Sequence, residues 1–166
     1  AGALTLDPEP FSVAALGENG EGKEITEDDF DEFSFDTSPY AIGKHLAEAQ
    51  VWRAAAEGLK VVVVCPTIIL GPWPGKKGSM SFFHFIRANS AFYTGGTMGY
   101  VDVNDVATIM LRLMDEDKMN ERYIVNAENV PFKSLFGGIA QNLNKPAPKI
   151  KLGKPAMHAF RYINNV

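Results

Sequence analysis

Tyr40 and Lys44 are the two residues of this sequence whose types and spacing most directly suggest chemistry. They lie in the segment SPYAIGKHLAEAQ (residues 38–50), and their spacing of four residues places both side chains on one face of a helix. An ammonium group beside a phenol stabilises the phenolate, so such a pair can exchange protons with a substrate near neutral pH. In the alternative interpretation, Tyr40 packs at the edge of the core and Lys44 is a solvated charge. The spacing alone leaves both interpretations open.

The segments around this pair predict a helix followed by a buried strand. Ser38 is a favourable N-cap and Pro39 suits the first helical position, so we expect a helix from there to about Glu57, ending at Gly58. The next segment, LKVVVVCPTIIL (59–70), is apolar on both faces, which is typical of a buried parallel strand. A helix, a glycine turn and a buried strand form half of a βαβ repeat, and the sequence therefore predicts an α/β fold with a mainly parallel sheet.

The strand ends on either side of the helix carry further polar groups. FSVAAL (11–16) has the character of a strand end and carries Ser12, whereas Pro66 and Thr67 follow the buried valines of the next strand. In a doubly wound sheet, ligands bind beyond the carboxyl ends of the strands. We therefore expect Ser12, the tyrosine and lysine of the helix, and the Pro66–Thr67 turn to converge on one crevice.

The remaining segments continue the alternation of helices and strands. We expect a loop at 71–78, a helix at 79–90, a strand at 99–103, a helix at 105–117 capped by Asn104 or Asp102, a strand at 122–126, a helix at 131–143, a proline-rich link at 145–148 and a last helix from about Pro155.

Composition argues against several classes of protein. No segment approaches the roughly 20 apolar residues of a membrane span, and no secretory signal pattern is present. The single cysteine, Cys65, fits a cytoplasmic protein, and three scattered histidines offer no spacing for metal ligands. The basic residues form no stripe for nucleic acid. Residues 18–36 hold nine acidic residues and one lysine, which predicts a solvated loop held down by its phenylalanines.

Five blocks of sequence, taken in order, carry a resemblance to a known family. They are SVAALG (12–17), YAIGK (40–44), EGLKVVVVCPTIILGP (57–72), YVDVNDVA (100–107) and ERYIVNAENV (121–130). Together they resemble the extended short-chain dehydrogenase/reductase family, which includes NAD-dependent epimerase/dehydratases and dihydroflavonol-reductase-like enzymes. The resemblance covers about residues 11–153. It implies an NAD(P)-binding, Rossmann-like, doubly wound parallel sheet with a small C-terminal α/β lobe that binds the substrate.

The resemblance also implies roles for individual residues. Tyr40 is similar to the family's catalytic acid/base, and Lys44 to the lysine that stabilises the phenolate and hydrogen-bonds the nicotinamide ribose. Ser12 corresponds to the residue that orients the substrate, although a turn-capping hydroxyl is the alternative. The backbone at Pro66 and Thr67 is similar to the family's turn against the nicotinamide carboxamide.

The segment GPWPGKKGSMSFFHF (71–85) is the expected wall of the substrate pocket, where Trp73 and Phe82 could stack on a flat substrate or pack in the core. Two residues depart from the family pattern. Met98 stands where many nucleotide-sugar epimerases carry an arginine that clamps a diphosphate, which favours a smaller carbonyl substrate. Cys65 replaces the usual arginine before the proline, so the hydrogen bonding of the turn is expected to differ.

The family's phosphate-binding pattern, G-x-x-G-x-x-G, is absent from this sequence, and GENGEG (17–22) is too acidic to take its place. The sequence is therefore expected to be the C-terminal half of a longer enzyme, with a sheet incomplete at the N-terminus. The missing N-terminal half is then its first partner, and alone the chain should bind NAD(P) weakly and self-associate. Residues 1–71 are assigned to the dinucleotide-binding domain and 72–166 mainly to the substrate lobe, with 99–126 as candidates to rejoin the Rossmann sheet.

The expected function is that of an NAD(P)-dependent oxidoreductase acting on a small carbonyl or alcohol, with NAD or NADP as cofactor and no metal. The alternative within the same fold is a nucleotide-sugar epimerase or dehydratase. The alternative of another class is a non-catalytic dinucleotide sensor or an inactive fragment. A homodimer is expected by analogy with relatives that pair through the helix of the tyrosine and lysine.

Overall fold

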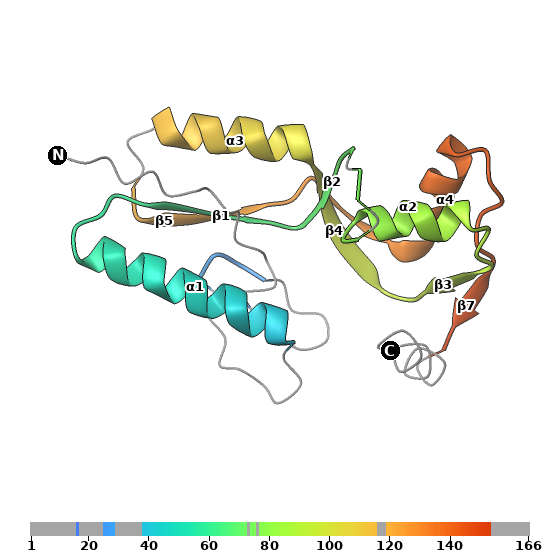
Figure 1. Ribbon diagram of the computed structural model, residues 1–166, viewed down its shortest axis with the longest axis horizontal. Coiled ribbons are helices and arrows are strands. Elements are labelled where there is room, and N and C mark those ends of the chain that lie inside the picture. Colours follow the sequence, from blue (N-terminus) through green and yellow to red (C-terminus); the bar gives the residue numbers. More distant parts are fainter. Residues whose placement is uncertain are drawn as a thin grey trace. The chain divides into compact units, whose positions relative to one another are not determined.

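The computed structural model describes residues 16, 25–28, 38–72, 74–75, 77–115 and 119–153 (Figure 1). The chain divides into two compact units. Unit 1 comprises Ala1–Thr67 and Val103–Asn126, and unit 2 comprises Ile68–Asp102 and Ala127–Val166. The chain therefore passes from one unit to the other after Thr67, after Asp102 and after Asn126.

Unit 1 is a parallel pair of strands between two helices. Its elements are α1 (Pro39–Ala56), β1 (Val62–Pro66), α3 (Val103–Asp115) and β5 (Glu121–Val125). β1 and β5 pair in parallel, with the register running from Val62 opposite Glu121 to Pro66 opposite Val125. α1 and α3 lie on opposite faces of this strand pair (Figure 1). β1 is consequently covered on both faces, which explains its run of apolar residues.

The predicted helix and buried strand of unit 1 are confirmed. The Ser38 hydroxyl accepts a hydrogen bond from the backbone N–H of Ala41 (3.2 Å), and Pro39 opens the helix. The helix ends where Gly58 adopts a φ of 104°, a left-handed conformation that favours glycine. In β1, the residues from Val63 to Pro66 are all buried.

α3 begins earlier than the sequence predicted. Its apolar stripe buries Val106 and Leu113, as expected from the helical spacing. The helix starts at Val103, so Asn104 lies inside it and cannot be its cap. Instead, the Asn104 carbonyl oxygen accepts a hydrogen bond from the Thr108 hydroxyl (2.7 Å). Of the two proposed caps, only Asp102 immediately precedes the helix.

The apolar segment 59–70 divides into two strands at the predicted Pro66–Thr67 turn. β1 ends at Pro66, and β2 (Ile68–Leu70) belongs to a different sheet in unit 2. Proline has no N–H to donate to a ladder, and Thr67 makes the last hydrogen bond to the end of β5, from its N–H to the Val125 carbonyl oxygen (3.0 Å). The two strands differ in burial, because Val63–Pro66 of β1 are buried whereas all three residues of β2 are only partly buried.

Unit 2 contains two small sheets and two helices. Its elements are β2, α2 (Met80–Arg87), β3 (Phe92–Thr94), β4 (Thr97–Asp102), β6 (Glu128–Pro131), α4 (Phe132–Asn142) and β7 (Ile150–Leu152). β4 is the central strand of the three-stranded sheet, parallel to β2 and antiparallel to β6, whereas β3 and β7 form a separate parallel pair. The strands β3 and β6 were not predicted from the sequence, because each is short and lacks a clear alternation.

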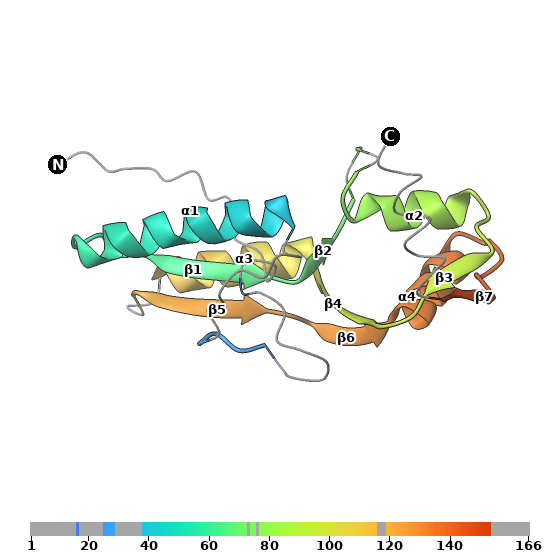
Figure 2. The same cartoon turned by 90° about the horizontal axis from the view of Figure 1, so that it is seen from below.

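Aromatic side chains form the core of unit 2, where α2 and α4 lie side by side (Figures 1 and 2). The ring of Phe136 lies 5.8 Å from that of Phe82, 5.6 Å from that of Phe85 and 5.9 Å from that of Phe132, measured between centroids. Offset and tilted pairs at these distances are favourable. Ile86 and Ile139 are buried in the same cluster.

Within the described ranges, no helix is both long and apolar enough to cross a bilayer. The same residues contain no cluster of three or more His, Cys, Asp or Glu side chains that could hold a metal ion.

Candidate active site

Tyr40 and Lys44 lie on one face of the first two turns of α1, as their spacing predicted. The Lys44 Nζ is 6.0 Å from the centroid of the Tyr40 ring, within the range of a cation–π contact. Tyr40 is 60% exposed. Lys44 is half-buried. A solvent-accessible phenol beside an ammonium is an arrangement that can pass a proton.

Pro66 and Thr67 lie at the same edge of unit 1 as this pair. α1 runs in the opposite direction to β1, so its first turns are beside the carboxyl end of that strand (Figures 1 and 2). This is the edge at which parallel α/β sheets bind their ligands. The start of α1 and the end of β1 thus lie at the same end of unit 1, and the convergence of the Tyr40–Lys44 pair with the Pro66–Thr67 turn on one ligand stays a prediction.

The hydrogen-bonding groups of Thr67 are already used within unit 1. Its N–H donates to the Val125 carbonyl oxygen, and its hydroxyl donates to the same oxygen (3.3 Å) or to Asn126 Oδ1 (3.1 Å). These bonds hold the end of β1 against the end of β5. A contact between this turn and a nicotinamide carboxamide stays a prediction, and it would have to use another atom of the turn or displace one of these bonds.

Of the other three predicted site residues, Phe82 is the one that the structure describes. Ser12 and Trp73 lie outside the described residues. Phe82 is on α2 in unit 2, where its partly buried ring packs against Phe132 (6.4 Å between centroids) and Phe136. Its role in a substrate pocket stays a prediction.

Glu48 is a residue of α1 that the sequence analysis missed. Its side chain is 1% exposed, and it is the buried charged residue of the described chain. Its Oε1 accepts hydrogen bonds from Trp52 Nε1 (2.9 Å) and Arg122 Nε (2.6 Å). Arg122 Nη2 is a further 2.5 Å contact of the same oxygen. Tyr40, Lys44 and Glu48 are spaced by four residues each, so they follow one another along one side of the helix. This spacing was the feature of the sequence that could have pointed to Glu48.

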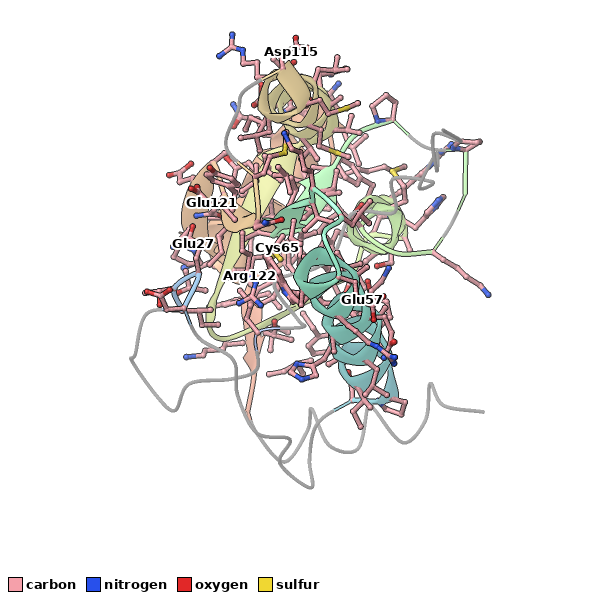
Figure 3. The ribbon with its side chains drawn as sticks, turned by 90° about the vertical axis from the view of Figure 1, so that its left-hand side faces the viewer. Glu27, Glu57, Cys65, Asp115, Glu121 and Arg122 are labelled. Carbon is pink, nitrogen blue, oxygen red and sulfur yellow. The ribbon has the colours of Figure 1, made fainter. Side chains whose placement is uncertain are left out.

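Arg122 also connects this cluster to a distant segment of unit 1. Its Nη1 donates to the main-chain oxygen of Glu27 (2.8 Å), and the Glu27 carboxylate accepts the N–H of Ile124 (3.0 Å). Figure 3 shows Glu27, Arg122 and Cys65 gathered beside the strands. Burial raises the pKa of the Cys65 thiol to about 12, and the charge of Glu48 adds to the rise. The thiol is therefore protonated at neutral pH and is a core group rather than a nucleophile.

Comparison with known proteins assigns the chain to a family. The family model described as "NAD dependent epimerase/dehydratase family" matches residues 11–127. The chain belongs to this family. Among its relatives, a putative dihydroflavonol 4-reductase of Synechocystis is 29% identical over 145 residues, which are 83% of this chain and 42% of the relative. Cinnamoyl-CoA reductase 1 of Arabidopsis thaliana is 30% identical over 117 residues, 68% of this chain and 33% of the relative. The resemblance to the extended short-chain family is thereby confirmed.

Solved structures confirm the Rossmann-like α/β fold. A nucleoside-diphosphate-sugar epimerase from Pseudomonas aeruginosa aligns with a TM-score of 0.80 at 22% identity, covering 93% of this chain and 51% of that structure. UDP-glucose 4-epimerase from Thermotoga maritima aligns with a TM-score of 0.69 at 23% identity, covering 85% of this chain and 48% of that structure. The chain thus spans about half the length of these structures and less than half of the curated relatives cited above.

Proposed function

We propose that the whole protein is an NAD(P)-dependent oxidoreductase that reduces a small carbonyl compound or oxidises the corresponding alcohol. The observation that carries this proposal is the arrangement of Tyr40 and Lys44. An exposed phenol lies beside an ammonium 6.0 Å from its ring centroid, at the edge of unit 1 where parallel sheets bind ligands. Membership of the NAD-dependent family supports the cofactor class.

We propose that residues of unit 1 would hold part of a dinucleotide at this edge. Lys44 is half-buried and lies one turn behind the exposed tyrosine, a place from which its ammonium could hydrogen-bond a nicotinamide ribose. The Pro66–Thr67 turn lies at the same edge and would contact the carboxamide. Bound NAD(P) supplies or accepts the hydride. In this proposal unit 1 belongs to the dinucleotide-binding domain, and unit 2 builds the substrate lobe.

The residues of the chain then handle the proton. In the reducing direction, the Tyr40 hydroxyl donates its proton to the substrate oxygen as the carbonyl carbon is reduced. Lys44 stabilises the phenolate that remains, because an isolated phenol with a pKa of about 10 loses its proton reluctantly near neutral pH. In the oxidising direction, the phenolate takes the proton from the alcohol. Ser12 is proposed to orient the substrate oxygen.

Two observations favour a reductase over a nucleotide-sugar epimerase. The two curated relatives described above are named as reductases. In addition, Met98 is 8% exposed in β4, opposite Val130 of β6, and its thioether offers no donor to a diphosphate. An arginine at this place would offer a bidentate clamp. The epimerase or dehydratase activity remains the second candidate, because the family includes both types of enzyme.

Turnover by the whole protein tests the proposal. Tyr40→Phe removes the proton donor, and we expect the rate of NAD(P)H oxidation with a panel of ketones and aldehydes to fall at least about 100-fold. Binding of NAD(P)H, followed by fluorescence, should stay within about twofold, since the ring remains in place. Tyr100→Phe is the matched control, because its hydroxyl binds Glu128 (3.1 Å) in unit 2, and it should keep wild-type turnover.

The outcomes separate the candidate functions. Wild-type turnover in Tyr40→Phe would contradict the proposed role of the tyrosine. Conversion of a UDP-sugar without net oxidation of the dinucleotide would favour the epimerase. Dinucleotide binding with no turnover of any substrate class would favour the non-catalytic sensor.

A further inference from the structure

α1 lacks the apolar stripe that normally fixes the rotation of a helix on a sheet. Its apolar residues are distributed all round the helix, and its two buried residues are Ala41, which is apolar, and Glu48, which is charged. α3, on the opposite face of the same strands, has a clear stripe that buries Val106 and Leu113. Apolar packing alone therefore selects one rotation for α3 and does not select one for α1.

The hydrogen bonds of Glu48 fix the rotation of α1 about its axis, which apolar packing does not fix. Glu48 Oε1 accepts a hydrogen bond from Nε of Arg122, a residue of β5 (2.6 Å). It also accepts one from Nε1 of Trp52, which lies one turn further along the helix (2.9 Å). Charge-assisted hydrogen bonds of this kind require defined distances and angles, whereas apolar contacts tolerate rotation. With the side chain 1% exposed, water cannot replace the lost partners if the helix turns.

Arg122, the partner of Glu48, is itself held in place by several contacts. Its side chain is 8% exposed, and its guanidinium lies 5.7 Å from the Trp52 ring centroid. Its Nη1 is bonded to the main-chain oxygen of Glu27, and its backbone lies in β5, paired with β1 (Figure 3). A helix attached to this arginine is therefore attached to the strands.

We propose that Glu48 is the positioning residue of the Tyr40–Lys44 pair and acts through Arg122. This inference rests on the proposed function of that pair. Glu48 follows Lys44 by one turn and Tyr40 by two turns, a distance of about 12 Å along the helix axis. Fixing the rotation of α1 at Glu48 fixes the direction in which both side chains leave the helix. A displacement of about 1 Å at a reacting group can lower a rate about 100-fold.

The chemistry of the ion pair fits a positioning role better than a role in net stability. Moving two charges out of water is costly, and replacing a buried ion pair by apolar residues of similar volume is often neutral or stabilising. A pair that adds little net stability can still select one arrangement among several of similar energy. In α1, which has no apolar stripe, that selection determines where the tyrosine points.

The test separates stability from position by removing both charges together in the whole protein. The double variant Glu48→Met/Arg122→Met nearly preserves the volume and removes both members of the buried ion pair together. The matched control is Arg53→Met/Glu57→Met, which removes an exposed ion pair of 3.3 Å at the end of the same helix. Three quantities are measured for each: the midpoint of urea unfolding, kcat and KM with NAD(P)H, and the fluorine NMR signal of fluorotyrosine at position 40, assigned through Tyr40→Phe.

We expect the Glu48/Arg122 double variant to unfold at nearly the wild-type urea concentration, with kcat lowered about 10-fold to 100-fold and KM nearly unchanged. Its Tyr40 signal should shift or broaden, because the helix is no longer held in one rotation. The Arg53/Glu57 control should match the wild type in all three. A double variant with wild-type kcat and a wild-type Tyr40 signal would overturn the proposal.

The NMR signal keeps this test independent of the proposed function. If the wild type shows no turnover, or if Tyr40→Phe keeps full turnover, the proposed function fails, whereas a changed Tyr40 signal in the double variant still supports the positioning by Glu48. An unchanged signal overturns the positioning whatever the activity. As a further check, Glu48→Gln/Arg122→Gln removes both charges but retains hydrogen-bonding side chains, and it should recover part of the lost kcat.

Discussion

Glu48 of α1 and Arg122 of β5 form a buried ion pair that joins residues 74 positions apart in the sequence. The Oε1 of Glu48 lies 2.6 Å from Arg122 Nε and 2.5 Å from Nη2, and the side chains are 1% and 8% exposed. Glu48 belongs to the helix that carries Tyr40 and Lys44, and Arg122 belongs to a strand of the sheet in the same unit. The ion pair therefore connects the candidate site to the sheet.

Removing only one charge of this pair should destabilise the protein strongly. Glu48→Gln removes the carboxylate charge that Arg122 Nε and Nη2 contact while the guanidinium stays buried, and we expect the free energy of unfolding to fall by about 3–5 kcal/mol. Glu57→Gln is the control on the same helix. Its partner Arg53 is 73% exposed and Glu57 itself is 68% exposed, so the change should stay below about 1 kcal/mol. Urea unfolding measures both, and equal effects would mean that burial does not govern the contribution of the pair.

Local sequence signals predicted the elements that carry the site. A cap at Ser38, a proline at the first helical position and a glycine at the end are sufficient to define α1, because each acts on the backbone beside it. The run of valines predicted β1, since only a strand covered on both faces is apolar throughout. The spacing of Tyr40 and Lys44 likewise determines their common face without reference to the rest of the fold.

Non-local relationships could not be predicted in this way. Glu48 lies in the mixed segment LAEAQVW (46–52), which does not mark it as buried. Its burial depends on Arg122, whose place beside α1 follows from the pairing of β5 with β1. The division of residues 59–70 between two sheets depends similarly on partners far along the chain. An apolar run indicates that a strand is buried, but it does not indicate with which other strands it pairs.

The cap of α1 should contribute measurably to stability. Ser38 Oγ accepts the N–H of Ala41 at 3.2 Å, so Ser38→Ala leaves one N–H of the first turn without this partner. We expect a loss of about 1 kcal/mol in the free energy of unfolding, measured in urea. Ser79→Ala is the matched control, because Ser79 precedes α2 without a side-chain capping bond, and its effect should be below about 0.5 kcal/mol. Similar losses in the two variants would contradict the capping role of Ser38.

Cys65 should make stability depend on pH in the alkaline range. Burial, with a contribution from Glu48, raises the pKa of its thiol from 9.0 to about 12 in the folded protein. In the unfolded chain the thiol ionises near the lower value, so the unfolded state loses a proton that the folded state retains. The stabilising difference is present in full below pH 9 and is lost as the pH rises from 9 towards 12.

Cys65→Val removes this dependence while it nearly preserves the volume of the side chain. Other groups also titrate above pH 9, and their contributions cancel when the two proteins are compared at each pH. We expect the free energy of unfolding of the wild type to decrease more steeply with pH than that of the variant, by up to about 1.4 kcal/mol per pH unit. Parallel curves would show that the thiol is ionised as easily in the folded protein as in the unfolded chain, and that the core around β1 admits water.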